Sequence, residues 1–344
     1  MDGTLGRYIS DFAITGLTSN PTIFDKAIKD SIFYDDAIRQ KTAEGKSGEA
    51  LFFELALEDL AQAADLFYPV HNATGGVDGW VSMEVSPLLA NDTASTIREA
   101  AQLHAQAQRG NLFIKIPGTR DGVPAIEDSI FAGVPINVTL LFSPEQYIAS
   151  AEAYMRGIER RIAAGLEPKV DSVASLFVSR WDVAVKDSVP KALRNRLGIA
   201  IAKRTYKAYR DLLASPRWRK LAAVGARPQR LLWASTGTKD PDTSDTLYIE
   251  ALAAPDTINT IPEKTLHAFA DHGQVKGILP VDGGDAEIVL TEFTQIGVDH
   301  ASLADLLQRE GTVAFDKSWQ DLMNCLAEKS AMLKKVNQAG AGQP

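Results

Sequence analysis

Cysteine and histidine are scarce in this sequence. Cys325 is the single cysteine, so no disulfide can form within the chain, and the five histidines are scattered. Neither HxxxH nor CxxC, the spacings that zinc sites use, occurs. The sequence therefore predicts a protein of the reducing cytoplasm, with no metal site.

Long apolar runs and basic clusters are also missing. No apolar run reaches the roughly 18 residues that a membrane span needs. The N-terminus, MDGTLGRYISDF, lacks the basic start and apolar block of a signal peptide. The net charge is −8, and no run of Lys and Arg indicates a nucleic-acid-binding face. We expect neither a membrane nor a nucleic acid as a partner.

The composition is otherwise that of a globular protein, with 45% hydrophobic and 23% charged residues among 344. Seven short β-prone runs alternate with longer helical patterns, and most read as continuously apolar, as strands buried on both faces do. The predicted strands are 13–19, 80–86, 112–117, 136–143, 173–179, 230–236 and 257–262. The predicted helices are 48–67, 93–108, 143–165, a long stretch over roughly 182–224, and the C-terminal region from about 285 to 335.

The helix at 143–165 carries clear signals at both ends. Ser143 can cap it, Pro144 suits the first helical position, and Gln146 completes a capping box. Gly165 fits a left-handed stop at the other end.

Strands that alternate with helices predict a parallel α/β sheet. No G-x-G-x-x-G follows the first strand, so a dinucleotide fold has no support. The spacing and length suit a (β/α)8 TIM barrel of about 250 residues plus insertions. Seven strands are visible, and the chain begins too soon for another upstream. We therefore predict a single barrel domain over 1–336 that lacks its first strand and has extra C-terminal helices, followed by a flexible tail or linker stub at 337–344.

Lys115 stands inside the apolar run "LFIKIP". A lysine on a strand can extend its amine to the surface, and that is the structural interpretation. The functional interpretation is a Schiff-base nucleophile, because an amine in an apolar pocket resists protonation and attacks carbonyl carbons. Glu84, on the preceding strand, could supply the proton shuttle that carbinolamine formation and dehydration require. A structural pairing of Glu84 with a basic residue is equally compatible with the sequence.

In a TIM barrel, the chemistry lies at the carboxyl ends of the strands. Most of the predicted strands carry polar residues near that end, which indicates a shared pocket. They are Thr18, Ser19 and Asn20; Glu84; Lys115; Asn137 and Thr139; Ser175 and Arg180; and Ser235 and Thr236.

Each of these candidates also has a structural interpretation. Asn20 is a good N-cap with Pro21 after it. Asn137 and Thr139 share one face of their strand and could form a polar layer inside the barrel. Arg180 could pair with an acid such as Asp182 or bind a phosphate bidentately. The turn "STGTK" (235–239) could be a simple loop or a set of phosphate donors.

Six segments, in order, resemble the transaldolase family, and its longer bacterial form is the most similar. They are "GLTSNPTIFDKAI", "SMEVSP", "LFIKIPGTRDGVPAIE", "GVPINVTLLFS", "VASLFVSRWD" and "LLWASTGTK". The resemblance implies a (β/α)8 barrel without metal or organic cofactor. It implies transfer of a dihydroxyacetone unit in the pentose phosphate pathway. The donor would be sedoheptulose 7-phosphate or fructose 6-phosphate, and the acceptor glyceraldehyde 3-phosphate or erythrose 4-phosphate.

The resemblance also implies roles for the residues. Lys115 would form the Schiff base, and Glu84 with Thr139 would handle the water and proton steps. The substrate-binding candidates are Thr18, from its position at a strand end, and by resemblance Asn20, Asn137, Ser175, Arg180 and Ser235. Shorter transaldolases have an arginine at the position of Gly237, so Lys239 is expected to substitute as the phosphate cation.

One departure concerns the first strand, where the family carries an acid/base aspartate for carbon–carbon cleavage. Asp2 has no strand leading into it and is not assigned this role. We therefore expect lower activity than in a chain extended upstream. The alternatives left open are a Schiff-base aldolase that releases free dihydroxyacetone and a degenerate sugar-phosphate-binding protein. A homodimer, and fusion or association with glucose-6-phosphate isomerase, also stay open.

Overall fold

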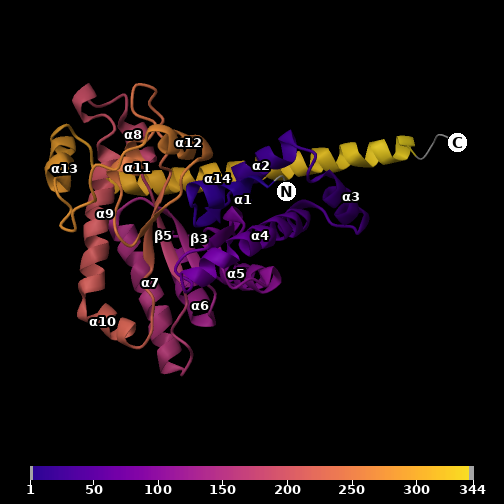
Figure 1. Ribbon diagram of the computed structural model, residues 1–344, viewed down its shortest axis with the longest axis horizontal. Helices are drawn as coiled ribbons and strands as arrows, with labels where there is room; N and C mark the ends of the chain where they lie inside the picture. Colours follow the sequence, from indigo (N-terminus) through magenta and orange to yellow (C-terminus); the bar gives the residue numbers. More distant parts are fainter. Residues whose placement is uncertain (1–2, 341–344) are drawn as a thin grey trace. The chain divides into compact units, whose positions relative to one another are not determined.

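The computed structural model describes residues 3–340, with side chains as far as Lys335. Strands and helices alternate along the chain (Figure 1). The strands are β1 (Gly16–Thr18), β2 (Trp80–Glu84), β3 (Leu112–Pro117), β4 (Ile136–Leu141), β5 (Ser172–Phe177), β6 (Arg230–Ala234) and β7 (Thr257–Asn259). The helices are α1 (Thr4–Phe12), α2 (Pro21–Asp30), α3 (Asp35–Ala43), α4 (Gly48–Ala73), α5 (Thr93–Ala107), α6 (Gly122–Ala132), α7 (Pro144–Ala163), α8 (Ser179–Val185), α9 (Leu197–Ala214), α10 (Pro216–Ala223), α11 (Leu247–Ala251), α12 (Glu263–His272), α13 (Ala286–Gln295) and α14 (His300–Gly340), with short 3-10 turns at Pro87–Leu89 and Lys191–Leu193.

The strands form one sheet in the order β1-β2-β3-β4-β5-β6-β7. The pairs β1–β2, β4–β5, β5–β6 and β6–β7 are all parallel. Within the described residues there is one strand fewer than the eight of a complete barrel, as the sequence predicts. The predicted strands are confirmed, and each observed strand lies within its predicted range except β5, which begins one residue early.

The chain divides into two compact units. The first unit comprises Met1–Leu88, Glu99–Ile114 and Val313–Pro344, and the second comprises Leu89–Arg98 and Lys115–Thr312. Two elements contain residues of both units. In β3 the second unit begins at Lys115, and in the continuous helix α14 the first unit resumes at Val313 (Figure 1). The single domain over 1–336 stays a prediction. Of the expected tail, 337–340 belong to α14, and 341–344 lie outside the described residues.

The first unit is organised around α4, which packs on β2. The buried amide of Asn111 donates to the carbonyl of Ala64 on α4 and to that of Gly79, each at 2.8 Å. On the other side, Trp319 of α14 lies edge-on to Phe52 of α4, with 5.0 Å between ring centroids. These contacts fix α4 between the strand end and the C-terminal helix.

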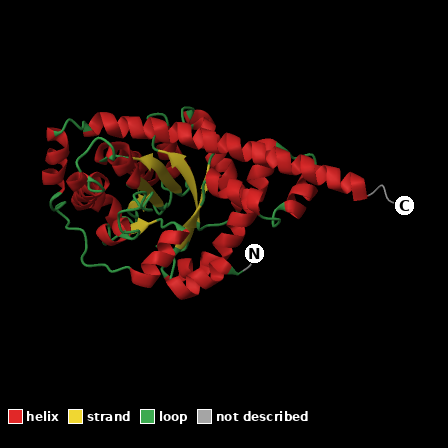
Figure 2. Cartoon of the chain, turned by 90° about the horizontal axis from the view of Figure 1, so that it is seen from above, coloured by secondary structure: helices red, strands yellow, loops and turns green. Residues whose placement is uncertain are grey.

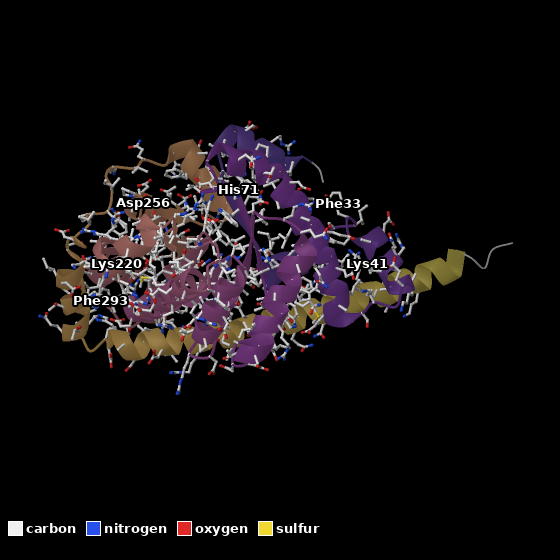
Figure 3. All side chains as sticks on the ribbon, turned by 90° about the horizontal axis from the view of Figure 1, so that it is seen from below. Phe33, Lys41, His71, Lys220, Asp256 and Phe293 are labelled. Carbon is white, nitrogen blue, oxygen red and sulfur yellow. The ribbon has the colours of Figure 1, made fainter. Side chains whose placement is uncertain are left out.

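In the second unit, α6 and α7 pack on β4, α7 packs on β5, and α9 packs on β6. Figure 2 shows helices beside the strands of the sheet. Tyr147 and Tyr154 of α7 and Tyr209 of α9 are fully buried, and the hydroxyl of Tyr154 donates to the carbonyl of Val170, 3.0 Å away. Phe293 of α13, labelled in Figure 3, is also fully buried, and α13 packs on α9.

The helix signals of the sequence are largely confirmed. Ser143 caps α7 by accepting from the backbone N–H of Gln146, and Gly165 has a left-handed φ of 71°. The capping box is wrong by one residue, because the Gln146 side chain accepts from the N–H of Phe142 rather than that of Ser143.

The single long helix predicted over 182–224 is wrong. The structure breaks it into α8, a 3-10 turn, α9 and α10. Pro190 and Pro216 cannot continue a helix from the preceding turn, and Asn195 has a positive φ of 59°. The hydroxyl of Ser215 then caps α10 by accepting from the N–H of Trp218.

Trp319 tests the packing of α14 on α4. Its side chain is 2% exposed and its Nε1 donates to Glu49 Oε1 at 3.0 Å. We expect Trp319→Ala to lower the free energy of unfolding by about 3–5 kcal/mol, since a large ring and a buried hydrogen bond are lost. Denaturant unfolding followed by circular dichroism measures this. The control is Val313→Ala on the same helix, whose side chain is 67% exposed and should change stability by about 0.5 kcal/mol or less. Equal stabilities of the two variants would contradict the packing account.

Candidate active site

Lys115 lies in the carboxyl-terminal half of β3 and belongs to the second unit. The residue is 7% exposed, and Ile114 and Ile116 on either side are fully buried. The structure therefore does not support the interpretation in which the amine reaches the outer surface. Burial in apolar surroundings is one of the arrangements in which a lysine serves as a Schiff-base nucleophile.

The neighbouring strands of the second unit carry a buried polar layer. Asn137 and Thr139 of β4 are each 1% exposed, and Ser175 of β5 donates its hydroxyl to Asn137 Oδ1 at 2.7 Å. The Asn137–Ser175 bond fits the structural interpretation of a polar layer, while a shared face for Asn137 and Thr139 stays a prediction. Thr139 differs, because its shielded Oγ1 makes no hydrogen bond within the described part of the chain. This hydroxyl is therefore available to a water molecule or a ligand.

Arg180 lies at the start of α8, directly after β5. Its guanidinium carbon is 5.5 Å from the ring centroid of Phe177. Burial lowers the pKa of Arg180 from its ordinary value, and the charge of Glu310 on α14 opposes that shift. A half-buried guanidinium of this kind is suited to a phosphate or carboxylate ligand.

The sequence left open an ion pair between Arg180 and Asp182, but the Asp182 carboxylate has other partners in the structure. Asp182 is 4% exposed, and its Oδ1 accepts from the backbone N–H groups of Leu197 and Gly198, at the start of α9. Its Oδ2 accepts from the hydroxyl of Tyr248 at 2.7 Å. Asp182 therefore anchors α8, which carries Arg180, to α9 and α11.

The turn "STGTK" follows β6 in the same unit. Ser235 has a left-handed φ of 55°, and its hydroxyl is 2.8 Å from that of Ser179. Lys239 is exposed, yet its Nζ lies 3.9 Å from where a Cβ would stand on Gly237. The Lys239 amine therefore lies close to Gly237.

The first unit brings together two further candidates. Asn20 caps α2, its side chain accepting from the N–H of Ile23 at 2.9 Å, so the structural interpretation of this residue is confirmed. Glu84 ends β2, and both of its carboxylate oxygens are shielded from solvent. Asn20 and Glu84 line the same small cavity of about 10 Å³, which is close to the room that one water molecule needs. Thr18 on β1 is half-buried and does not line this cavity.

Sequence reasoning missed several neighbours of these side chains. Ser179 and Phe177 stand in the segment "LFVSR" beside Arg180, so a signal was present in the sequence. Glu310 lies about 130 residues from Arg180 along the chain, so the sequence gives no indication that its charge acts on Arg180.

The described residues were predicted to hold neither a metal site nor a membrane span, and two findings concern these features. No three His, Cys, Asp or Glu side chains in this part gather as metal ligands would. No described helix is both long and apolar enough to span a membrane. A cavity of about 470 Å³ in the second unit contains none of the predicted site residues in its lining, which includes Ser143, Arg204 and His300.

Comparison with known proteins supplies the family. A sequence model of the Transaldolase/Fructose-6-phosphate aldolase family matches residues 3–326. The chain belongs to this family. The transaldolase of Parafrankia sp. (strain EAN1pec) is 44% identical to it over 337 residues, which cover 95% of this chain and 91% of that protein. The transaldolase of Thermobifida fusca (strain YX) is 43% identical, with 96% and 92% covered, and that of Mycolicibacterium smegmatis is 40% identical, with 97% and 92% covered. The resemblance of six segments to the transaldolase family is thereby confirmed.

Asp182 gives this family member a testable pH dependence. Burial raises its pKa to about 6, above its ordinary value of 3.8, although Tyr248 and two backbone N–H groups oppose the shift. The folded protein therefore holds this proton more tightly than the unfolded chain does. As the pH rises from about 4 through about 6, ionisation of Asp182 costs about 3 kcal/mol of stability. Asparagine does not ionise, so we expect the stability of Asp182→Asn to lack this decrease as the pH rises.

The measurement is the free energy of unfolding of Asp182→Asn and of the unsubstituted protein at matched pH values. The difference should shift in favour of the variant as the pH rises over this window. A difference that stays constant, or that shifts against the variant, would show that folding does not raise the pKa of Asp182.

Proposed function

We propose that this chain is a transaldolase that forms a Schiff base at Lys115. It would transfer a dihydroxyacetone unit from sedoheptulose 7-phosphate or fructose 6-phosphate to glyceraldehyde 3-phosphate or erythrose 4-phosphate. The observation that carries the proposal is the burial of Lys115 on a strand of a transaldolase-family chain. The relatives that carry the name transaldolase support it.

The reaction follows from the chemistry of a lysine amine. Lys115 Nζ attacks C2 of the ketose phosphate, and loss of water from the carbinolamine gives the Schiff base. The C4 hydroxyl then loses its proton, the bond between C3 and C4 breaks, and the aldose phosphate leaves as an aldehyde. The electron pair of the broken bond passes to the protonated imine and gives an enamine. The enamine carbon then bonds to the aldehyde carbon of the second aldose phosphate, and water releases the product from Lys115. We assign the water and proton steps at C2 to Glu84 and Thr139.

The substrate is held by hydroxyl-binding and phosphate-binding groups. We assign Thr18, Asn20, Asn137 and Ser175 to the hydroxyls of the sugar. For the phosphate we assign Arg180, Ser235 and Lys239. The half-buried guanidinium of Arg180 and the small hydroxyl-rich turn at 235–239 support the phosphate assignment, because phosphate takes charge-assisted and backbone donors together.

The family also includes fructose-6-phosphate aldolases, which makes an aldolase the second candidate function. Glu84 favours transfer, because the related small aldolases commonly have glutamine there. A degenerate sugar-phosphate-binding protein is the third reading of the sequence. The cytoplasmic setting, a homodimer and an association with glucose-6-phosphate isomerase stay predictions.

Lys115→Met tests the nucleophile directly. We expect it to lower the rate of transfer from fructose 6-phosphate to erythrose 4-phosphate by about 10³-fold or more, since the covalent path is closed. Production of glyceraldehyde 3-phosphate in a coupled assay gives the rate. Free dihydroxyacetone, assayed in the same reaction, should form much more slowly than the transfer product.

Three results would decide against the proposal. Comparable release of free dihydroxyacetone would assign the chain to the aldolases. Binding of substrate without any turnover by the unsubstituted protein would assign it to binding proteins. Full activity of Lys115→Met would remove Lys115 from the mechanism.

Lys239→Met tests the phosphate cation. Loss of one ammonium from a phosphate site should lower kcat/KM by about 10- to 100-fold, mainly through a higher KM. The control is Lys220→Met. Lys220, which is labelled in Figure 3, is an exposed residue of α10, the helix that precedes β6 in the chain. Lys239 has no phosphate role if both variants retain the KM of the unsubstituted protein.

A further inference from the structure

Between two paired positions, β4 has one residue more than its partner β5. Val138 pairs with Ala174 and Leu141 with Leu176, so three steps along β4 match two steps along β5. The irregularity coincides with Leu140, whose φ is 59°. Left-handed backbone is strained for a leucine, and such strain persists only where the surroundings impose it.

The bulge lies directly after Thr139. A bulge bends its strand and redirects the neighbouring side chains, and bulges are frequent next to active sites. Thr139 Oγ1 is shielded from solvent and makes no hydrogen bond in the described part of the chain. No hydrogen bond of its own fixes the direction of this hydroxyl, and the strained backbone of Leu140 is its neighbour in the chain.

Gln308 of α14 holds that backbone. Its Nε2 donates to the carbonyl of Leu140 at 2.9 Å and to the carbonyl of Gly118 at 3.0 Å. The N–H of Gly118 in turn donates to the carbonyl of Thr139 at 2.7 Å. One side-chain amide thus joins the bulge of β4 to the turn that follows β3, three residues after Lys115.

A glycine of α14 allows the helix to lie close to the bulge of β4. Gly311 lies three residues after Gln308, on the same face of α14. A Cβ on Gly311 would stand 3.0 Å from Cδ2 of Leu140, whose side chain is 1% exposed. Glycine at this position lets the helix backbone approach the bulge closely enough for Gln308 to reach both carbonyls.

We propose that Gln308 is a positioning residue for the transfer reaction, which sets the direction of the Thr139 hydroxyl through the Leu140 bulge. The inference rests on the proposed function, in which Thr139 serves the water and proton steps. Because Gln308 acts through a group that serves chemistry, its loss should lower kcat and leave KM nearly unchanged.

The test is a double-mutant cycle between Gln308→Met and Thr139→Ala. Met keeps the length of the glutamine side chain but has no donor. We expect Gln308→Met alone to lower kcat by about 10- to 100-fold, with KM changed by about threefold at most. In the Thr139→Ala background the same substitution should change kcat by about twofold at most. A merely structural role would lower the rate equally in both backgrounds.

Two further variants complete the design. Gln320→Met is the matched control, because Gln320 is an exposed glutamine of the same helix that donates to Asn324, and it should retain the kcat of the unsubstituted protein. Gln308→Glu keeps the side-chain length but turns an acceptor toward two carbonyl oxygens, so its kcat should fall at least as far as that of Gln308→Met. Circular dichroism spectra confirm that each variant is folded.

The outcomes separate this inference from the function on which it rests. If the unsubstituted protein shows no transfer, the proposed function fails and the inference fails with it. If transfer is present and Gln308→Met matches Gln320→Met, or if the two effects of the cycle add, the inference alone is overturned.

Discussion

The parallel register of β4, β5 and β6 is the constraint on which the second unit depends. Ser175 lies opposite Leu232 of β6, and its hydroxyl reaches Asn137 of β4, so neighbouring strands end at the same edge. Parallel strands in register bring their carboxyl ends together, and the groups that follow them collect there. A slip of one residue would turn Asn137 and Ser175 toward the helices and leave two buried polar groups unpaired.

The strand register alone does not fix the orientation of each side chain. Hydrogen bonds and strained backbone next to the candidate site residues add to it. Asp182 ties α8 to the start of α9, and Arg180 is carried on α8. Ser235 is held in left-handed backbone beside Ser179. Strained backbone also occurs at Leu140, next to Thr139. Strained backbone of this kind clusters at active sites, where the packing of the surrounding structure compensates its energetic cost.

Much of the fold could be read from the sequence because its signals are local. Short β-prone runs, most of them continuously apolar, mark all seven strands. Asn20 and Ser143 mark helix starts by capping chemistry that acts within three residues. The single helix predicted over 182–224 is wrong because Pro190 and Pro216 interrupt it. The candidate site residues were predicted from two signals together, their position at strand ends and the family resemblance. With one of these signals alone, Asn137 and Ser175 could equally form an ordinary polar layer.

What the sequence could not supply is the set of supports that come from distant parts of the chain. Gln308 meets Gly118 across 190 positions, and nothing about an isolated glutamine in a helical pattern indicates its two carbonyl partners. The positive φ of Leu140 is equally hidden, because leucine seldom adopts it and only the packed structure imposes it. Such features depend on tertiary contacts, and a pattern of residue types does not encode them locally.

The measurement that tests the central claim most directly is chemical trapping of the intermediate. The protein is incubated with fructose 6-phosphate, reduced with borohydride and digested, and the modified peptide is located by mass spectrometry. The account predicts a sugar or three-carbon adduct on the peptide that contains Lys115, and no adduct without reduction. An adduct on a different lysine, or none in a protein that carries out transfer, would contradict it.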